Sequence, residues 1–266
     1  MGKIFITLNV SESKRLIAKG VALDPHIIKA FNKGLIIIAA GTTNAFIYEE
    51  ITNNKLRDKS RYPAGVVHGG KACVTDKNTR IPYKVIANGK EIDADWKVVI
   101  EDFDHGDVFI KGGNALDSDG NVGILLADNR AGTIGKAFPI INARGAKLLL
   151  PVGLEKLIQS VPEVVNEMGT DVLDRGMGKK VGMMSINYGI LYTEIEAIKR
   201  LAEVEVIHAA AGGVGGSEGS QSFILEGNKN ELDKIIELLR NIKGEEPISI
   251  DNFKCPCEEP CLFPYR

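Results

Sequence analysis

The stretch that decides the fold is Leu35-Ile36-Ile37-Ile38-Ala39-Ala40-Gly41-Thr42-Thr43-Asn44. Its apolar, β-branched half is typical of a strand buried on both faces, as in a parallel sheet covered by helices. The polar half and the stretch to Glu50 predict a tight loop followed by a helix. The first backbone amides of that helix and the threonine hydroxyls would suit an anion. An ordinary strand-to-helix turn with a threonine cap is the alternative.

Apolar runs alternate with helix-period segments on both sides of this stretch. The pattern predicts an α/β fold, with a three-layer, mostly parallel sheet flanked by helices over residues 1–180. Residues 52–80 show no clear period and stay unassigned. Besides 35–40, we expect strands at 3–9, 83–87, 96–101, 108–110 and 147–152, with Asn88-Gly89 as a hairpin turn between 83–87 and 96–101.

The pattern changes at about residue 181. Residues 181–250 follow the order β-α-β-β-α-β, which predicts a smaller ferredoxin-like α+β unit, and residues 251–266 form a Cys-rich tail. A glycine-rich run at 209–220 joins two strands of this unit. Because no helix follows it, a nicotinamide-binding or P-loop role is excluded. We expect it to close over the main pocket or to shape a subunit contact.

Composition limits the function classes. The chain has 266 residues, 44% of them hydrophobic, and a formal net charge of −2, so we expect a folded protein without nucleic acid or membrane partners. The N-terminus lacks the pattern of a signal peptide, and the run from Leu35 to Ala40 is far shorter than the roughly 20 residues of a membrane span. These features predict a cytoplasmic protein.

A second polar loop follows the short apolar run Val108-Phe109-Ile110. It reads Lys111-Gly112-Gly113-Asn114-Ala115-Leu116-Asp117, in which the glycines would let the backbone approach a ligand. Lys111 could neutralise a phosphate or carboxylate, or simply be solvated at the surface. Since ligands of open α/β sheets lie at the carboxyl ends of the strands, this loop and Gly41-Thr42-Thr43-Asn44 should line one pocket. A plain turn is the alternative for the residues after Leu116.

These two segments resemble a known superfamily. Gly41-Thr42-Thr43-Asn44 after its strand resembles the phosphate loop of ribose-5-phosphate isomerases, and residues 107–117 resemble a second pocket loop of the same group. The superfamily also includes glucosamine-6-phosphate isomerases/deaminases, coenzyme A transferases and the effector domains of sugar-responsive repressors. The resemblance implies an isomerase-like or coenzyme A transferase-like enzyme that acts on a small anionic metabolite. Its ligand-binding residues would be Gly41, Thr42, Thr43, Asn44, Lys111, Gly112, Gly113 and Asn114.

The same resemblance suggests catalytic carboxylates. The Asp-Gly-Ala-Asp-Glu motif of the isomerases is absent, and their Arg-Glu-Lys is matched loosely by Leu154-Glu155-Lys156. Glu155 would move a proton or, as in coenzyme A transferases, act as a nucleophile; a helix-starting residue is the alternative. Asp117 is the second proton-transfer candidate. The missing motif favours the main rival hypothesis, a non-catalytic metabolite sensor.

The tail holds Cys255, Cys257 and Cys261 within seven residues. Three thiolates predict zinc or part of an iron–sulfur cluster, with a fourth ligand from Cys73, a histidine or another subunit. A redox-active or structural tail is the alternative. The second alternative function is therefore a metal or redox protein organised around these cysteines. His68 could be an acid/base group or part of a loop edge, and self-association of the chain is left open.

Overall fold

The computed structural model describes residues 1–250, Cys255, Cys261 and Leu262. Its largest sheet has six strands in the order β12-β10-β7-β2-β5-β6. The first four are parallel to one another. The fifth strand runs antiparallel to the fourth, and the sixth runs antiparallel to the fifth. This mixed sheet with helices confirms the α/β class. The strands are β12 (Ile190–Tyr192), β10 (Lys147–Pro151), β7 (Val108–Ile110), β2 (Leu35–Ile38), β5 (Lys84–Ala87) and β6 (Lys90–Ile92).

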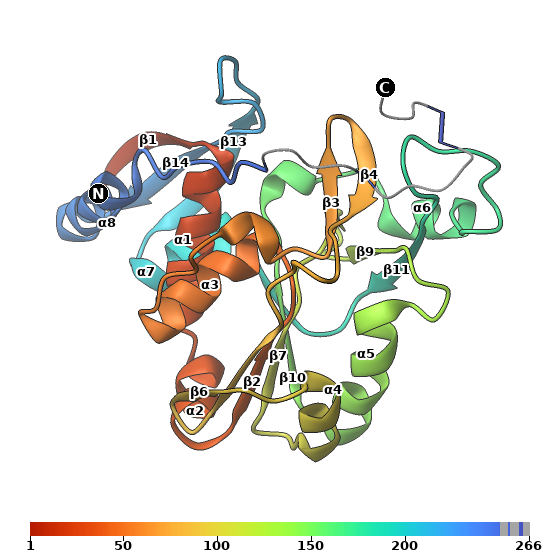
Figure 1. Ribbon diagram of the computed structural model, residues 1–266. Helices are drawn as coiled ribbons and strands as arrows, with labels where there is room; N and C mark the ends of the chain where they lie inside the picture. The colour runs from red at the N-terminus through yellow and green to blue at the C-terminus, as the bar shows by residue number, and fades with distance from the viewer. Residues whose placement is uncertain (251–254, 256–260, 263–266) are drawn as a thin grey trace.

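Helices cover both faces of the six-stranded sheet (Figure 1). Helices α1 (Val10–Ala22) and α3 (Thr42–Thr52) lie on one side, and α5 (Gly132–Arg144) lies on the other. The central strands β2 and β7 are therefore shielded from water on both faces, and the side chains of Ile36 and Phe109 are fully buried. Continuous apolar runs form these strands because neither face meets solvent.

Helix α1 connects the large sheet to the rest of the chain. Asn9 and Glu12 form a capping box at its start. Gly20 lies so close to α7 (Glu194–Leu201) that an added Cβ would be 2.6 Å from the Cα of Ala197. Arg15 is buried and donates to Glu49 of α3 over 2.7 Å. Helix α1 is thus held by close packing on one side and an ion pair on the other.

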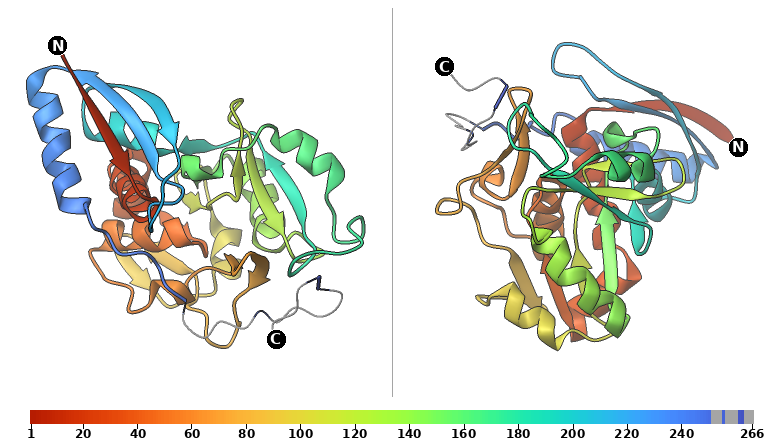
Figure 2. Two further views of the ribbon diagram at one scale, coloured as in Figure 1. Left: turned by 90° about the horizontal axis from the view of Figure 1, so that it is seen from above. Right: turned by 90° about the vertical axis from the view of Figure 1, so that its right-hand side faces the viewer.

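A second sheet has three antiparallel strands in the order β1-β14-β13, with helix α8 (Lys229–Ile242) packed against it (Figure 2). Its strands are β1 (Gly2–Leu8), β14 (Gln221–Gly227) and β13 (Glu205–Ala211). The strands expected within residues 181–250 therefore do not pair only among themselves. β11 (Gly182–Ile186) pairs with β9 (Val122–Leu126), which pairs with β8 (Ala115–Leu116), and β12 joins the large sheet.

The structure also corrects the segment after β5. The turn Asn88-Gly89 is confirmed, with φ values of 47° and 79° that suit a two-residue hairpin loop, but it leads into β6. The strand expected at 96–101 is wrong. Residues Trp96–Val99 form helix α4, because the side chain of Asp95 caps the backbone N–H of Lys97.

The unassigned region 52–80 contains a hairpin of β3 (Gly65–His68) and β4 (Lys71–Val74). The remaining helices of the described residues are α2 (Pro25–Lys33) and α6 (Val161–Glu167), with short 3₁₀ turns at η1 (Lys59–Arg61), η2 (Ile100–Asp102) and η3 (Leu154–Lys156). Across the described part of the chain, no helix combines the length and the apolar character needed to cross a membrane.

Candidate functional site

Polar residues follow each of the four parallel strands at the same edge of the large sheet. Gly41–Asn44 follow β2, Lys111–Asn114 follow β7, Gly153–Lys156 follow β10, and Thr193 and Glu194 follow β12. The carboxyl ends of parallel strands are where open α/β sheets bind ligands. The candidate site is built on this edge.

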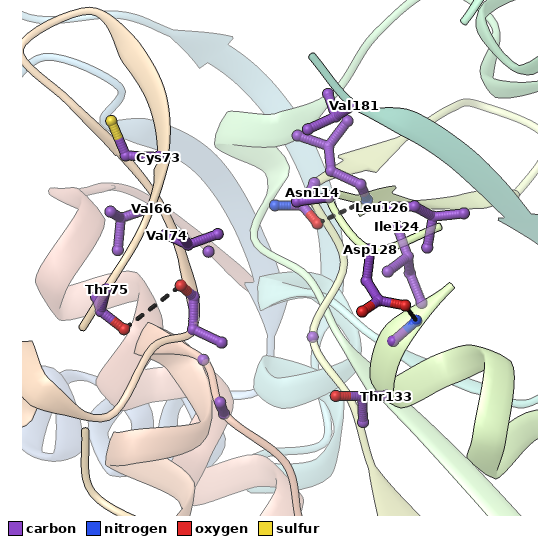
Figure 3. A pocket seen from close by; sticks show the side chains of 18 of the residues that line it. Val66, Cys73, Val74, Thr75, Asn114, Ile124, Leu126, Asp128, Thr133 and Val181 are labelled. Carbon is purple, nitrogen blue, oxygen red and sulfur yellow. Dashed lines mark hydrogen bonds between the residues drawn. The ribbon is translucent and has the colours of Figure 1, made fainter. Parts of the chain in front are cut away.

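A cavity of about 980 Å³ opens there. Figure 3 shows Val66, Val74 and Thr75 of the β3–β4 region on one side and Asn114, Ile124 and Leu126 on the other. The eight residues expected from sequence to bind a ligand all line it: Gly41, Thr42, Thr43, Asn44, Lys111, Gly112, Gly113 and Asn114. The structure therefore brings the two predicted loops together and adds the hairpin, which the sequence did not reveal.

The start of helix α3 faces this cavity with buried polar groups. Gly41 is the N-cap and makes no side-chain cap. Asn44 is fully buried, and its Nδ2 donates to the carbonyl oxygen of Ala39 over 2.8 Å. Its Oδ1, like Oγ1 of buried Thr43, has no hydrogen-bond partner within the protein. An added Cβ on Gly112 would be 3.8 Å from that Oδ1. The helix start thus offers a positive dipole end beside polar atoms that still need partners.

Two lysines lie over adjacent glycine carbonyls in the same wall. Lys111 Nζ donates to Gly112 O over 2.8 Å, and Lys156 Nζ donates to Gly113 O over 3.1 Å. Burial, with a smaller contribution from the charge of Lys156, lowers the pKa of Lys111 to about 8. Two cations so close together raise each other's energy, which an anion between them would relieve.

Glycine has a packing role in this wall. A Cβ on Gly113 would be 2.4 Å from Cγ1 of Val122, and a Cβ on Gly112 would be 3.4 Å from the carbonyl oxygen of Pro151. The lack of side chains therefore lets the loop after β7 lie against β9 and β10. At the other end of the cavity, the carboxylate of Asp128 accepts from the backbone N–H of Arg130 over 2.8 Å and from that of Gly132, the first residue of α5, over 3.3 Å.

Asp117 lies outside the cavity lining, in the turn between β8 and β9. Its carboxylate is buried and accepts hydrogen bonds from the backbone N–H groups of Asp119, Asn121 and Val161 at 3.1, 2.9 and 3.0 Å. Burial raises the pKa of Asp117, but these bonds outweigh it and hold the pKa below its usual value. The carboxylate stabilises the turn and the start of α6.

Glu155 also lies outside the cavity lining. Its Oε1 is 3.9 Å from Lys156 Nζ, and its Oε2 is buried without a hydrogen bond. Behind it lies Glu194, which sequence reasoning missed. Glu194 is fully buried at the end of β12, and its Oε2 accepts from the backbone N–H of Leu154 over 2.9 Å. Its position two residues beyond the end of β12, comparable to that of Glu155 four residues beyond the end of β10, was the available signal.

Two of the cysteines, Cys73 and Cys255, meet at the β3–β4 hairpin. Cys73 of β4 lines the cavity and forms a disulfide with Cys255, and Cys261 Sγ accepts from the backbone N–H of Gly178 over 3.4 Å. Cys257 lies outside the described residues. Within the described part of the chain, no group of three or more His, Cys, Asp and Glu side chains is placed to hold a metal. His68 lies in β3 and is not a lining residue.

Comparisons of the chain with protein-family models, with curated proteins and with solved structures gave no match. The site is therefore interpreted from its own geometry.

Proposed function

We propose that the cavity binds a small anionic metabolite and that the protein is an isomerase-like or coenzyme A transferase-like enzyme. The observation that carries this proposal is the pair Lys111 and Lys156 on adjacent carbonyls beside the uncapped start of α3. A phosphate or carboxylate there would meet two ammonium groups and free backbone amides. The proposal includes the superfamily resemblance. It also includes the three-layer arrangement of residues 1–180 and the ferredoxin-like unit of residues 181–250.

Among the groups in the cavity, Lys111 suits acid–base chemistry. With a pKa of about 8, roughly a tenth of its amines are neutral at pH 7. In an isomerisation, the neutral amine would take a proton from the carbon next to a carbonyl and return it to the neighbouring carbon. The enediolate formed between the two steps would be stabilised by Lys156 and the α3 dipole. Glu155 does not line the cavity, so it would act on this chemistry through Lys156. The coenzyme A transferase-like form needs Glu155 as a nucleophile in contact with the substrate. The geometry therefore favours the isomerase-like form.

Calorimetric titration with sulfate and with ribose 5-phosphate tests binding. Lys111→Met and Lys156→Met should each weaken binding at least about tenfold, since each removes a charge-assisted contact. Lys29→Met, at an exposed position on α2, is the matched control. Proton NMR of the sugar phosphate in D₂O tests turnover, because an isomerase exchanges the hydrogen next to the carbonyl for deuterium. Unchanged binding in both variants would refute the anion site.

A non-catalytic metabolite sensor is the second candidate. It is favoured by the position of Asp117 and Glu155, neither of which lines the cavity. A sensor should bind the sugar phosphate with the same dependence on Lys111 and Lys156 but exchange no hydrogen. Exchange that is lost in Lys111→Met would exclude it.

A metal or redox protein is the third candidate, because the tail reaches the cavity wall through Cys73 and Cys255. These two sulfurs are bonded to each other, so they could bind zinc or an iron–sulfur cluster only after reduction. Elemental analysis of protein purified under reducing, oxygen-free conditions tests this. Metal bound in wild type and lost in Cys73→Ser would support the site, and a metal-free wild type would exclude it.

A further inference from the structure

A cluster of buried oxygen atoms without hydrogen-bond partners lies behind the cavity wall. They come from three elements, η3, α7 and β14. Buried polar atoms are nearly always paired, so several unpaired ones in one place call for an explanation. The atoms are Glu155 Oε2 of η3, Glu194 Oε1 of α7 and Gln221 Oε1 of β14, and the hydroxyl of Ser13 of α1 lies beside Glu194.

The two carboxylates share one peptide group. Glu194 Oε2 accepts from the backbone N–H of Leu154 over 2.9 Å. Glu155 Oε2 folds back over the preceding residue, so that an added Cβ on Gly153 would be only 1.9 Å from it. Both acidic side chains therefore lie close to the Gly153–Leu154 peptide.

Polar groups from the small sheet and from α1 close the cluster. Gln221 Nε2 donates to the carbonyl oxygen of Gly219 over 2.9 Å, and an added Cβ on Gly219 would be 3.7 Å from Cβ of Glu155. The hydroxyl of Ser13 interacts with the carboxylate of Glu194. Ser13, Glu194 and Gln221 are each at most 1% exposed. Glu155, with a side chain that is 14% exposed, is the member of the cluster closest to solvent.

The charged groups around the pair are unevenly placed. Lys156 lies 3.9 Å from Glu155, and Lys14 of α1 also interacts with Glu155. The charged side chain that interacts with Glu194 is Glu155 itself. Burial and the charge of Glu155 together raise the pKa of Glu194 to about 7, while burial and Lys156 lower the pKa of Lys14 to about 8. The two lysines make the cluster unsuitable for a divalent cation, since they would repel it.

We propose that Glu155 and Glu194 form a buried acid pair that holds a single proton, and that Lys156 couples this proton to the anion in the cavity. One proton turns an unpaired acceptor into a donor for its neighbour and removes one of two repelling charges. Lys156 contacts Gly113 O on the cavity side and Glu155 on the other. An anion that draws Lys156 away from Glu155 leaves that carboxylate less compensated, so the pair binds its proton more tightly.

The acid pair can be tested without any ligand. Infrared spectra of the full chain between about pH 5.5 and 8.5 should show the carbonyl band of a protonated carboxylic acid that disappears with an apparent pKa near 7. The band should be absent from Glu194→Gln and kept in the control Glu163→Gln, whose side chain is exposed on α6. A wild type without such a titrating band would overturn the proposal, and this measurement does not require that any variant folds.

The coupling rests on the proposed anion site, and calorimetry with sulfate separates the two. Sulfate stays fully ionised near pH 7, so heats in buffers of different ionisation enthalpy report protons taken up by the protein. Wild type should take up a few tenths of a proton more than Glu194→Gln, in which Lys111 and Lys14, each about nine-tenths protonated there, can take up only about a tenth each. Equal uptake by both proteins would overturn the coupling. A titrating band in a protein that does not bind sulfate would refute the proposed function and the coupling but leave the acid pair standing.

Discussion

Replacing Glu194 with glutamine should stabilise the protein, and more so as the pH rises. In the folded chain the pKa of Glu194 is raised from 4.5 to about 7. The folded state therefore holds this proton more tightly than the unfolded state does between these two pH values. Its stabilising effect is complete below pH 4.5 and is lost as the pH rises through about 7. At 1.36 kcal/mol for each pKa unit, the ionised carboxylate costs the folded state about 3 kcal/mol above pH 7.

Glutamine has the same shape and carries no charge at any pH. Its amide oxygen can still accept from the N–H of Leu154, and its amide N–H groups can donate where the ionised carboxylate can only accept. Glu194→Gln should therefore match wild type at about pH 4 and exceed it by up to about 3 kcal/mol at about pH 8.5.

Urea unfolding followed by circular dichroism measures this difference. The urea midpoint should move while the slope m stays constant, as expected for a change in stability alone. Glu163→Gln, exposed on α6, controls for the loss of one surface charge. A difference between Glu194→Gln and wild type that is the same at every pH, or a variant that is less stable at alkaline pH, would refute the reasoning.

Three further predictions concern other parts of the molecule. Sulfate affinity should fall as the pH rises through about 8, where Lys111 loses its charge, and calorimetry should show a flatter pH profile in Lys111→Met. Asp117→Asn should lower the free energy of unfolding by about 1–3 kcal/mol while sulfate affinity stays within about twofold of wild type; a variant of normal stability that no longer binds would contradict the structural role. Gly20→Ala should cost about 1–3 kcal/mol in urea unfolding, because its Cβ would be 2.6 Å from the Cα of Ala197; a neutral effect would mean that α1 and α7 can separate freely.

The central strands β2, β7 and β10 of the large sheet were predictable from sequence because they are buried on both faces. The runs at 35–38, 108–110 and 147–151 are continuous and apolar, so they stand out without any information on pairing. The second sheet was not predictable in this way. Gly2 pairs with Gly227, and no local pattern tells which strands meet across such a distance. The β3–β4 hairpin was missed because its residue types do not follow its alternation in burial: Lys71 is buried, whereas Val67 is exposed.

The cavity loops were predictable, but the direction of their acidic side chains was not. Parallel strands end at one edge, so Gly41–Asn44 and Lys111–Asn114 had to lie close together. Asp117 is six residues beyond Lys111, yet its carboxylate turns back to cap the loop after Leu116. Glu194 belongs to a sequence, Thr193-Glu194-Ile195-Glu196, that looks like an ordinary helix start with a capping box, and only packing shows that its side chain is buried.

Two consecutive residues, Glu155 and Lys156, connect the acid pair to the cavity. Lys156 lines the cavity and Glu155 faces Glu194, so a proton on one side and an anion on the other act on the same ion pair. Coupling between two bound species is reciprocal. If protonation of the pair strengthens anion binding tenfold, saturating anion must raise the apparent pKa of the pair by about one unit. The size of that pKa change in the infrared titration with sulfate therefore measures the link directly, before any substrate of the protein is identified.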